Sequence, residues 1–189
     1  KRVGAVGITP DATLGVSGSA DGTVRVWDLD EQVERFVIPV GHGEVWSLAV
    51  TPDGRSVVSG SDDGSIDVWN LASGALIRRW QGERRWRALV LTPDGTRLIS
   101  GSEGPALLWD FASASILAPI QASRATTVIA ISADGRLMMI GGMYDEVTLW
   151  DLAGNRSIVQ WHQGNDSWVS AVALTPDGRH AFSADWEGR

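Results

Sequence analysis

The sequence predicts an all-β fold in which four-stranded antiparallel sheets repeat along the chain. Two landmarks recur at one spacing: a Thr-Pro-Asp-Gly type of turn returns after 42, 41, 40 and 43 residues, and a Trp-Asp or Trp-Asn pair after 42, 40 and 41 residues. The turns begin at Thr9, Thr51, Thr92, Ser132 and Thr175. The pairs begin at Trp27, Trp69, Trp109 and Trp150. A shared period of about 40 residues in two independent landmarks is typical of an architecture with one sheet per repeat.

The second repeat shows why each unit is expected to hold four strands. Short alternating apolar stretches are separated by a Pro-Asp-Gly turn, a Ser-Asp-Asp-Gly turn and a Ser-Gly break. The strands are expected at 46–50, 55–59, 65–69 and 75–80. Asp-Gly supplies the positive backbone φ that a tight hairpin needs, and no stretch keeps a helical period.

One such sheet cannot bury both faces alone, so neighbouring sheets must stack, and radial stacking gives a β-propeller. We expect about four and a half blades. They cover residues 1–40, 41–81, 82–122, 123–165 and, as a partial blade, 166–189. The chain begins without Met and ends inside a predicted turn, so we expect a fragment of a longer protein. Its ring would be completed by missing blades or by self-association, because open sheet edges invite pairing.

These repeats resemble the WD-repeat β-propeller family over essentially the whole chain, and repeat two keeps most of the family's pattern. In that family a His, a Ser or Thr, an Asp and the Trp form a hydrogen-bonded network inside the blade. The resemblance places this structural network on His42, Ser59, Asp63 and Trp69. The chemistry is reasonable, because a buried indole N–H and a buried imidazole both need partners.

The other repeats depart from this pattern to different degrees. Repeat one keeps Ser17, Asp21 and Trp27, and repeat three is one residue shorter in its second turn. Repeat four has Ile140 and Tyr144 at the Ser and Asp places. We therefore expect blade four to lack the network and to depend on packing.

Composition argues against catalysis and against several classes of partner. The chain has no Cys, which excludes disulfides, thiolate metal sites and a Cys nucleophile, and fits a cytoplasmic location. A net charge of −7 with both signs interspersed disfavours nucleic acid and membrane partners. No phosphate-binding loop, paired metal-binding His or nucleophile motif is present, so we predict no catalytic site, no cofactor and no metal.

Tryptophan is unusually frequent, with ten in 189 residues, and the blade pattern explains only some of them. Four others lie near the loops that the family resemblance places on one rim of the ring, and tryptophan and arginine are enriched at binding hot spots. We therefore predict a partner-binding rim. Its residues are Trp46, Arg85, Trp86, Arg87, Trp168 and Trp186, with Glu44, Asp62 and Met143 nearby.

Five arginines around Trp80 and Trp86 have two further interpretations, a solvated loop or a binding surface. They are Arg78, Arg79, Arg84, Arg85 and Arg87. Stacking on nucleic-acid bases is conceivable, but an acidic peptide or a phosphorylated group fits an acidic protein better.

The favoured function is a protein-interaction scaffold or sensor module of a larger bacterial signalling protein, because the Thr-Pro-Asp-Gly-Arg style of repeat is similar to that of bacterial members of the family. The alternative is a propeller-type enzyme with its site in the central channel. The first-strand positions that such a site would use are Leu48, Val50, Leu89 and Leu91. Their aliphatic side chains disfavour it.

Overall fold

The computed structural model describes residues 1–41, 43–82, 85–143, 145–162 and 167–187. Within these ranges every regular element is a β-strand, so the all-β prediction is confirmed. Among the same residues there is no helix long and apolar enough to cross a membrane.

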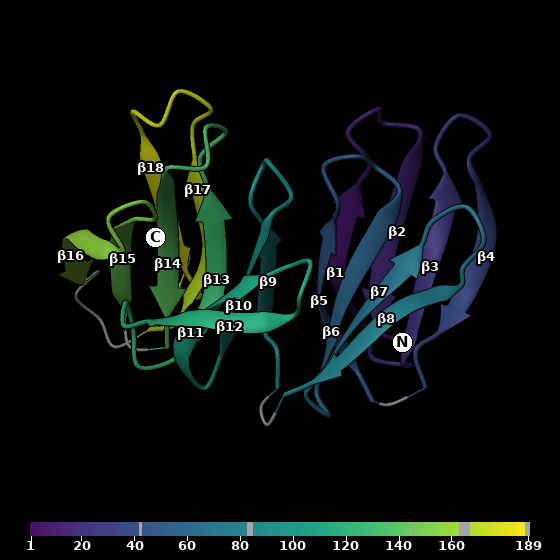
Figure 1. Ribbon diagram of the computed structural model, residues 1–189, viewed down its shortest axis with the longest axis horizontal. Helices are drawn as coiled ribbons and strands as arrows, with labels where there is room; N and C mark the ends of the chain where they lie inside the picture. The colour runs from purple at the N-terminus through teal and green to yellow at the C-terminus, as the bar shows by residue number, and fades with distance from the viewer. Residues whose placement is uncertain (42, 83–84, 144, 163–166, 188–189) are drawn as a thin grey trace. The chain divides into compact units, whose positions relative to one another are not determined.

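The strands form five antiparallel sheets, which we call blades 1 to 5 in chain order (Figure 1). Blade 1 consists of β1 (Val3–Ile8), β2 (Leu14–Ser19), β3 (Thr23–Asp28) and β4 (Val33–Pro39). Blade 2 consists of β5 (Val45–Val50), β6 (Ser56–Ser61), β7 (Ser65–Asn70) and β8 (Leu76–Gln81). Blade 3 consists of β9 (Ala88–Leu91), β10 (Arg97–Ser102), β11 (Gly104–Asp110) and β12 (Ser115–Ile120). Blade 4 consists of β13 (Thr126–Ile131), β14 (Leu137–Gly142), β15 (Glu146–Asp151) and β16 (Arg156–His162), and blade 5 of β17 (Val169–Leu174) and β18 (Ala181–Asp185).

In each sheet, strands that follow one another in the chain also lie side by side. The chain divides into two compact units, residues 1–91 and 92–189, and each unit is described by itself below.

The turn between the first two strands is built the same way in every blade. In blade 2 the Thr51 hydroxyl donates a hydrogen bond to Asp53 Oδ1 at 2.6 Å, and the Arg55 N–H donates to the same oxygen at 3.0 Å. Gly54 takes the positive φ of 68° that closes the turn. Since donors surround the carboxylate, the pKa of Asp53 is lowered, first of all by the Thr51 hydroxyl. The repeated sequence motif therefore closes the turn between the first two strands with side-chain hydrogen bonds.

Within residues 1–91 the core lies between blades 1 and 2. Val16 and Val26 of blade 1 pack in one cluster with Val45 and Val57 of blade 2. The blades approach so closely at Gly18 that a Cβ added there would lie 2.5 Å from Val45 Cγ1. Each buried valine contributes about 1.5–3 kcal/mol through burial of apolar surface, so this contact stabilises the pair of blades.

The two faces of a blade differ in what they pack against. Trp69 and Leu71 of blade 2 are 6% and 1% exposed, whereas the matching Trp27 and Leu29 of blade 1 are 37% and 39% exposed. We call this uncovered surface of blade 1 its open face. In blade 5 the other face is uncovered, the one that a blade turns toward the next blade in the chain. Phe182 on this face is 58% exposed, although its counterpart in blade 4, Met139, is fully buried.

Candidate functional site

The candidate site lies at the end of each blade where the first strand begins and the second strand ends, which we call the rim. A backbone hydrogen bond marks the same place in three blades. The Ala20 N–H donates to the Arg2 carbonyl at 2.9 Å. The Asp62 N–H donates to the Glu44 carbonyl at 3.1 Å, and the Trp186 N–H donates to the Trp168 carbonyl at 3.2 Å. Six side chains therefore occupy equivalent rim positions of their own blades.

Trp46 is the centre of the rim in residues 1–91. Its half-buried ring carries two guanidinium groups: Cζ of Arg2 lies 4.4 Å from the ring centroid, and Cζ of Arg87 lies 5.7 Å from it. The indole Nε1 is enclosed and makes no hydrogen bond within the described part of the chain. We call these three residues the Trp46 cluster. Arg2, at the start of the chain, was not predicted as a site residue.

Trp86 is not exposed at the rim, so it is removed from the predicted surface. Its side chain is 1% exposed, and its Nε1 donates to the Gly64 carbonyl at 2.7 Å. The ring packs over Gly82, where an added Cβ would overlap it. The reason is the register. Trp86 lies six residues before Thr92, as Val45 lies six before Thr51, and Val45 is also 1% exposed.

The acidic residues of the predicted rim shape a loop. The Glu44 N–H donates to Asp62 Oδ1 at 2.9 Å, which ties the start of the first strand to the turn after the second. Both residues are half-buried, and Arg85 is exposed two positions before Arg87.

Residues 92–189 carry a second set of predicted rim residues. Trp168 is 43% exposed and Trp186 is 76% exposed, while Met143 is half-buried. The structure thus brings Trp46 together with Arg87, and Trp168 together with Trp186, each within its own unit.

Of the predicted structural network in blade 2, the described residues show the bond between Trp69 and Ser59, and Asp63 serves the neighbouring turn. Trp69 Nε1 donates to the fully buried Ser59 Oγ at 2.9 Å. Asp63 accepts the Ser65 N–H at 2.9 Å and so closes the turn before β7. His42 lies outside the described residues. The same indole-to-serine bond occurs in blade 1 at 3.0 Å and in blade 3 at 2.8 Å.

Blade 4 lacks this indole-to-serine bond. Ile140 pairs with Thr148 in the register in which Ser59 pairs with Asp67. Trp150 Nε1 is consequently buried with no hydrogen-bond partner among the described residues. Tyr144, expected at the Asp place, lies outside the described residues.

The predicted arginine cluster is divided between two roles. Arg79 makes a bidentate ion pair with the fully buried Asp67, with N–O distances of 2.6 and 2.8 Å. The hydrogen bond to Asp67 raises the pKa of Arg79, so this guanidinium stays charged on the outer strand β8. Residues directly opposite each other on neighbouring strands point to the same face of a sheet, and Arg79 lies opposite Asp67. The alternation of side chains along the expected strands would have indicated this pair. Arg85 and Arg87 remain at the rim, and Arg84 lies outside the described residues.

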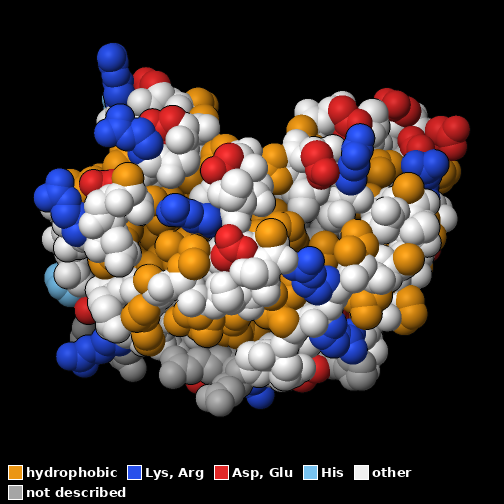
Figure 2. Space-filling model, viewed as in Figure 1, with side chains coloured by type: hydrophobic (Ala, Val, Ile, Leu, Met, Phe, Trp, Pro, Cys, Tyr) orange, Lys and Arg blue, Asp and Glu red, His pale blue; other side chains and the backbone are white. Residues whose placement is uncertain are grey.

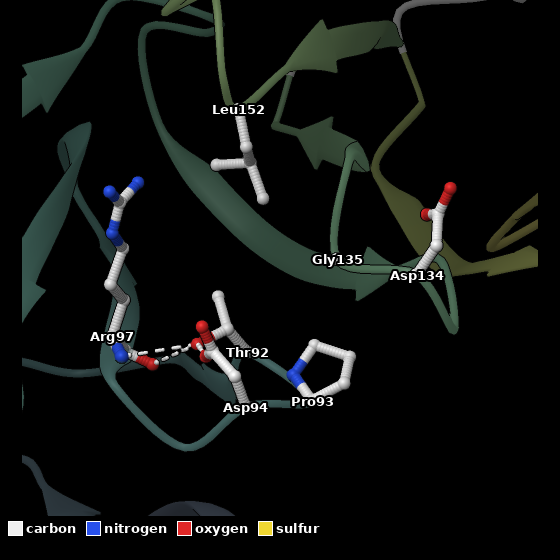
Figure 3. Close-up of a pocket in the computed structure, with 7 residues that line it drawn as sticks. All are labelled: Thr92, Pro93, Asp94, Arg97, Asp134, Gly135 and Leu152. Carbon is white, nitrogen blue, oxygen red and sulfur yellow. Dashed lines mark hydrogen bonds between the residues drawn. The ribbon is translucent and has the colours of Figure 1, made fainter.

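One pocket is lined by residues of two hydrogen-bonded turns. It has a volume of about 120 Å³ and lies between the Thr92 and Ser132 turns, and Figure 3 shows Asp94 and Asp134 on separate loops around it. Asp94 accepts the Thr92 hydroxyl at 2.5 Å and the Thr96 N–H at 3.0 Å, so its carboxylate is already engaged. No group of three or more His, Asp or Glu in the described ranges could hold a metal ion.

The visible surface carries both signs of charge. Figure 2 shows basic and acidic side chains scattered between hydrophobic patches on this face. The first-strand positions proposed for an enzyme site are apolar: Leu89 and Leu91 are each 8% exposed, and Leu48 and Val50 pack against the core between blades 1 and 2. Such side chains offer no acid, base or nucleophile.

Comparison with known proteins agrees with this architecture. The family model described as "WD domain, G-beta repeat" matches residues 1–28, 34–70 and 156–189, just over half of the chain. Protein groucho of Drosophila melanogaster is 33% identical over 101 residues, which are 51% of this chain and 14% of the relative. Nuclear distribution protein PAC1 of Arthroderma otae is 27% identical over 137 residues, which are 59% of this chain and 29% of the relative. The chain thus spans less than a third of the length of either relative.

Proposed function

Because this chain belongs to the WD-repeat family of β-propeller proteins, we propose that it is a scaffold or sensor module that binds a peptide or protein partner at the rim of its blades. Membership of this family supports a protein-binding scaffold in general. A fold does not by itself fix a function, so the proposal depends on the rim.

One observation carries it: large aromatic side chains occupy rim positions where blade packing does not require them. Trp168 and Trp186 stand where blade 2 has Glu44 and Asp62, and the same backbone hydrogen bond joins both pairs. The blade therefore forms with either kind of side chain. Exposed tryptophans cost solubility, and an aromatic residue enclosed by a partner contributes strongly to binding.

Further parts of the proposal concern the protein to which these blades belong. We propose a cytoplasmic bacterial signalling polypeptide, supported by the Thr-Pro-Asp-Gly-Arg style of repeat. Its ring would be completed by further blades or by self-association, which the open face of blade 1 supports. An enzyme remains the alternative, and the apolar first-strand positions count against it.

The test uses Trp186 as both probe and variant. A photo-crosslinking amino acid at position 186 identifies the partner, and calorimetry then compares the wild type with Trp168→Ala and Trp186→Ala. We expect each substitution to weaken binding by more than about 1 kcal/mol with unchanged circular dichroism.

The matched control for this test is Ile158→Ala on the outer strand β16, where the side chain is 52% exposed. Its affinity should equal that of the wild type. Equal affinity of all three variants would refute the rim as the binding surface.

A further inference from the structure

A polar cavity of about 240 Å³ lies within residues 92–189, where the chain passes from blade 3 to blade 4. The connection between β12 and β13 supplies one wall, and β15 and β16 supply the other. Its polar lining consists of Gln121, Ser123, Arg124, Glu146 and Gln160. The volume lies just below the roughly 300–1,000 Å³ of pockets for drug-sized ligands, so the cavity suits a smaller molecule.

The register of blade 4 explains why these side chains meet. Thr148 on β15 lies opposite Gln160 on β16, so both point to the same face of the sheet. Glu146 precedes Thr148 by two residues and therefore shares that face. The Thr148 hydroxyl donates to the Ala122 carbonyl at 2.7 Å, which shows that the β12–β13 connection covers this face. The neighbours of Ala122 in the chain thus lie across from Glu146 and Gln160.

Blade 2 has a pair of charges at the place where blade 4 is neutral. Asp67 and Arg79 stand in the same register as Thr148 and Gln160, and they bind each other through two hydrogen bonds. In blade 4 the hydroxyl turns to a backbone carbonyl instead. The exposed Gln160 carboxamide therefore keeps its donors and acceptor available among the described residues.

Two opposite charges line the cavity without pairing with each other. The Ser123 hydroxyl shares its proton between Glu146 Oε2 and the Ala125 carbonyl, each at 3.1 Å, so the carboxylate is held toward the connection. Arg124 is exposed and forms neither an ion pair nor a hydrogen bond within the described ranges. The cavity thus keeps a positive and a negative group apart.

A ligand that carries both charges would pair with both groups at once. A guanidinium binds a carboxylate through two parallel hydrogen bonds, and a carboxylate accepts the N–H groups of an ammonium. A purely anionic ligand would leave Glu146 without a counter-charge, and a purely cationic ligand would do the same to Arg124. An α-amino acid carries its ammonium and its carboxylate on one carbon, so its charges balance as those of the cavity do.

We propose that this cavity binds a free α-amino acid, with the carboxylate on Arg124 and the ammonium on Glu146. The carboxamides of Gln121 and Gln160 provide further hydrogen bonds to the ligand. This goes beyond the proposed function, because the ligand is a small molecule and not a peptide or protein. The bound amino acid would connect the β12–β13 connection to β15, and so stabilise the folded state.

The experiment screens the whole 189-residue chain against the common L-amino acids by thermal unfolding, and calorimetry then measures the affinity of the strongest binder. Its α-amide lacks the carboxylate charge, and its N-acetyl derivative lacks the ammonium. We expect each derivative to bind at least about tenfold more weakly than the amino acid, as the loss of a charge-assisted hydrogen bond implies.

Two variants assign the charges to residues. Arg124→Gln should bind the amino acid and its α-amide equally, and Glu146→Gln should bind the amino acid and its N-acetyl derivative equally. Both substitutions keep the size of the side chain, and Gln at position 146 can still accept the Ser123 proton. The matched control is Arg97→Gln, which removes an exposed positive charge at the pocket of about 120 Å³ and should bind as the wild type does.

Several results would overturn this inference and leave binding at the rim intact. They are the absence of binding by every amino acid, equal affinity of the wild type for the amino acid and either derivative, and discrimination that both variants retain. An effect of Arg97→Gln as large as that of Arg124→Gln would reduce the result to net charge and overturn it too. The rim is tested separately, because its variants Trp168→Ala and Trp186→Ala should bind the amino acid as the wild type does.

Discussion

At the scale of single residues, one hydrogen bond recurs in surroundings of different exposure. The blade tryptophan donates to a serine at 2.9 Å in blade 2 and at 3.0 Å in blade 1. Trp69 is 6% exposed, whereas Trp27 is 37% exposed. An indole N–H that loses its acceptor inside blade 2 has no access to water, but in blade 1 it does.

We therefore expect Ser59→Ala to lower the free energy of unfolding by about 1–3 kcal/mol, the cost of an unsatisfied buried donor. Ser17→Ala should cost less than about 0.5 kcal/mol, because water replaces the serine. Urea titration of both variants measures the difference. Equal losses would show that the bond matters for its geometry and not for its burial.

At the scale of elements, the five Thr-Asp or Ser-Asp turns act as one repeated unit. The hydroxyl-to-carboxylate distances are 2.6, 2.6, 2.5, 2.6 and 2.5 Å along the chain. In all five the pKa of the Asp is lowered, and the hydroxyl of the Thr or Ser is the largest cause. The folded state thus holds these carboxylates ionised more firmly than the unfolded chain does.

A lowered pKa in the folded state predicts stability that is present above the unfolded pKa and is lost as the pH falls through the folded pKa. We expect the free energy of unfolding to decline below about pH 4. A variant with Asn at positions 11, 53, 94, 134 and 177 should show a smaller decline between pH 7 and pH 3 in guanidinium titrations. An identical decline in both proteins would assign the acid sensitivity to other carboxylates.

The period of the sequence was enough to predict these elements, because each strand and turn depends on local chemistry that repeats. The exposure of Trp86 was predicted wrongly, since aromatic character was weighed before register. Val45 and Val169, which lie as many residues before their turns as Trp86 does, are each 1% exposed. An alignment of the repeats residue by residue would therefore have placed Trp86 in the core. The contact of Arg2 with Trp46 could not be predicted, because nothing in the local pattern connects residues 44 positions apart.

At the scale of the whole molecule, the uncovered apolar faces determine how the chain behaves in solution. Ile8 on the open face of blade 1 is 62% exposed, and Phe182 on blade 5 is 58% exposed. Apolar surface of this kind favours association. We expect light scattering to give a mass above that of one chain, falling with dilution.

The variants Ile8→Lys and Phe182→Lys should lower that mass without unfolding the protein, because both side chains are already in contact with water. Ile77→Lys on β8 of blade 2, where the isoleucine is 55% exposed, serves as the control and should leave the mass unchanged. A single-chain mass for the wild type at all concentrations would contradict this prediction.

The two faces of a blade are unlike, and this has a consequence for symmetry. The face that surrounds Trp69 in blade 2 is covered by the Val16 and Val26 face of blade 1, never by a copy of itself. Association that repeats this packing is therefore heterologous, so it cannot stop at a two-fold pair and must either close into a ring or continue as a filament. Such an assembly has a direction, because the face that each copy presents differs from the face that it covers. A partner with several anchoring segments would then bind it with an avidity that no single copy provides.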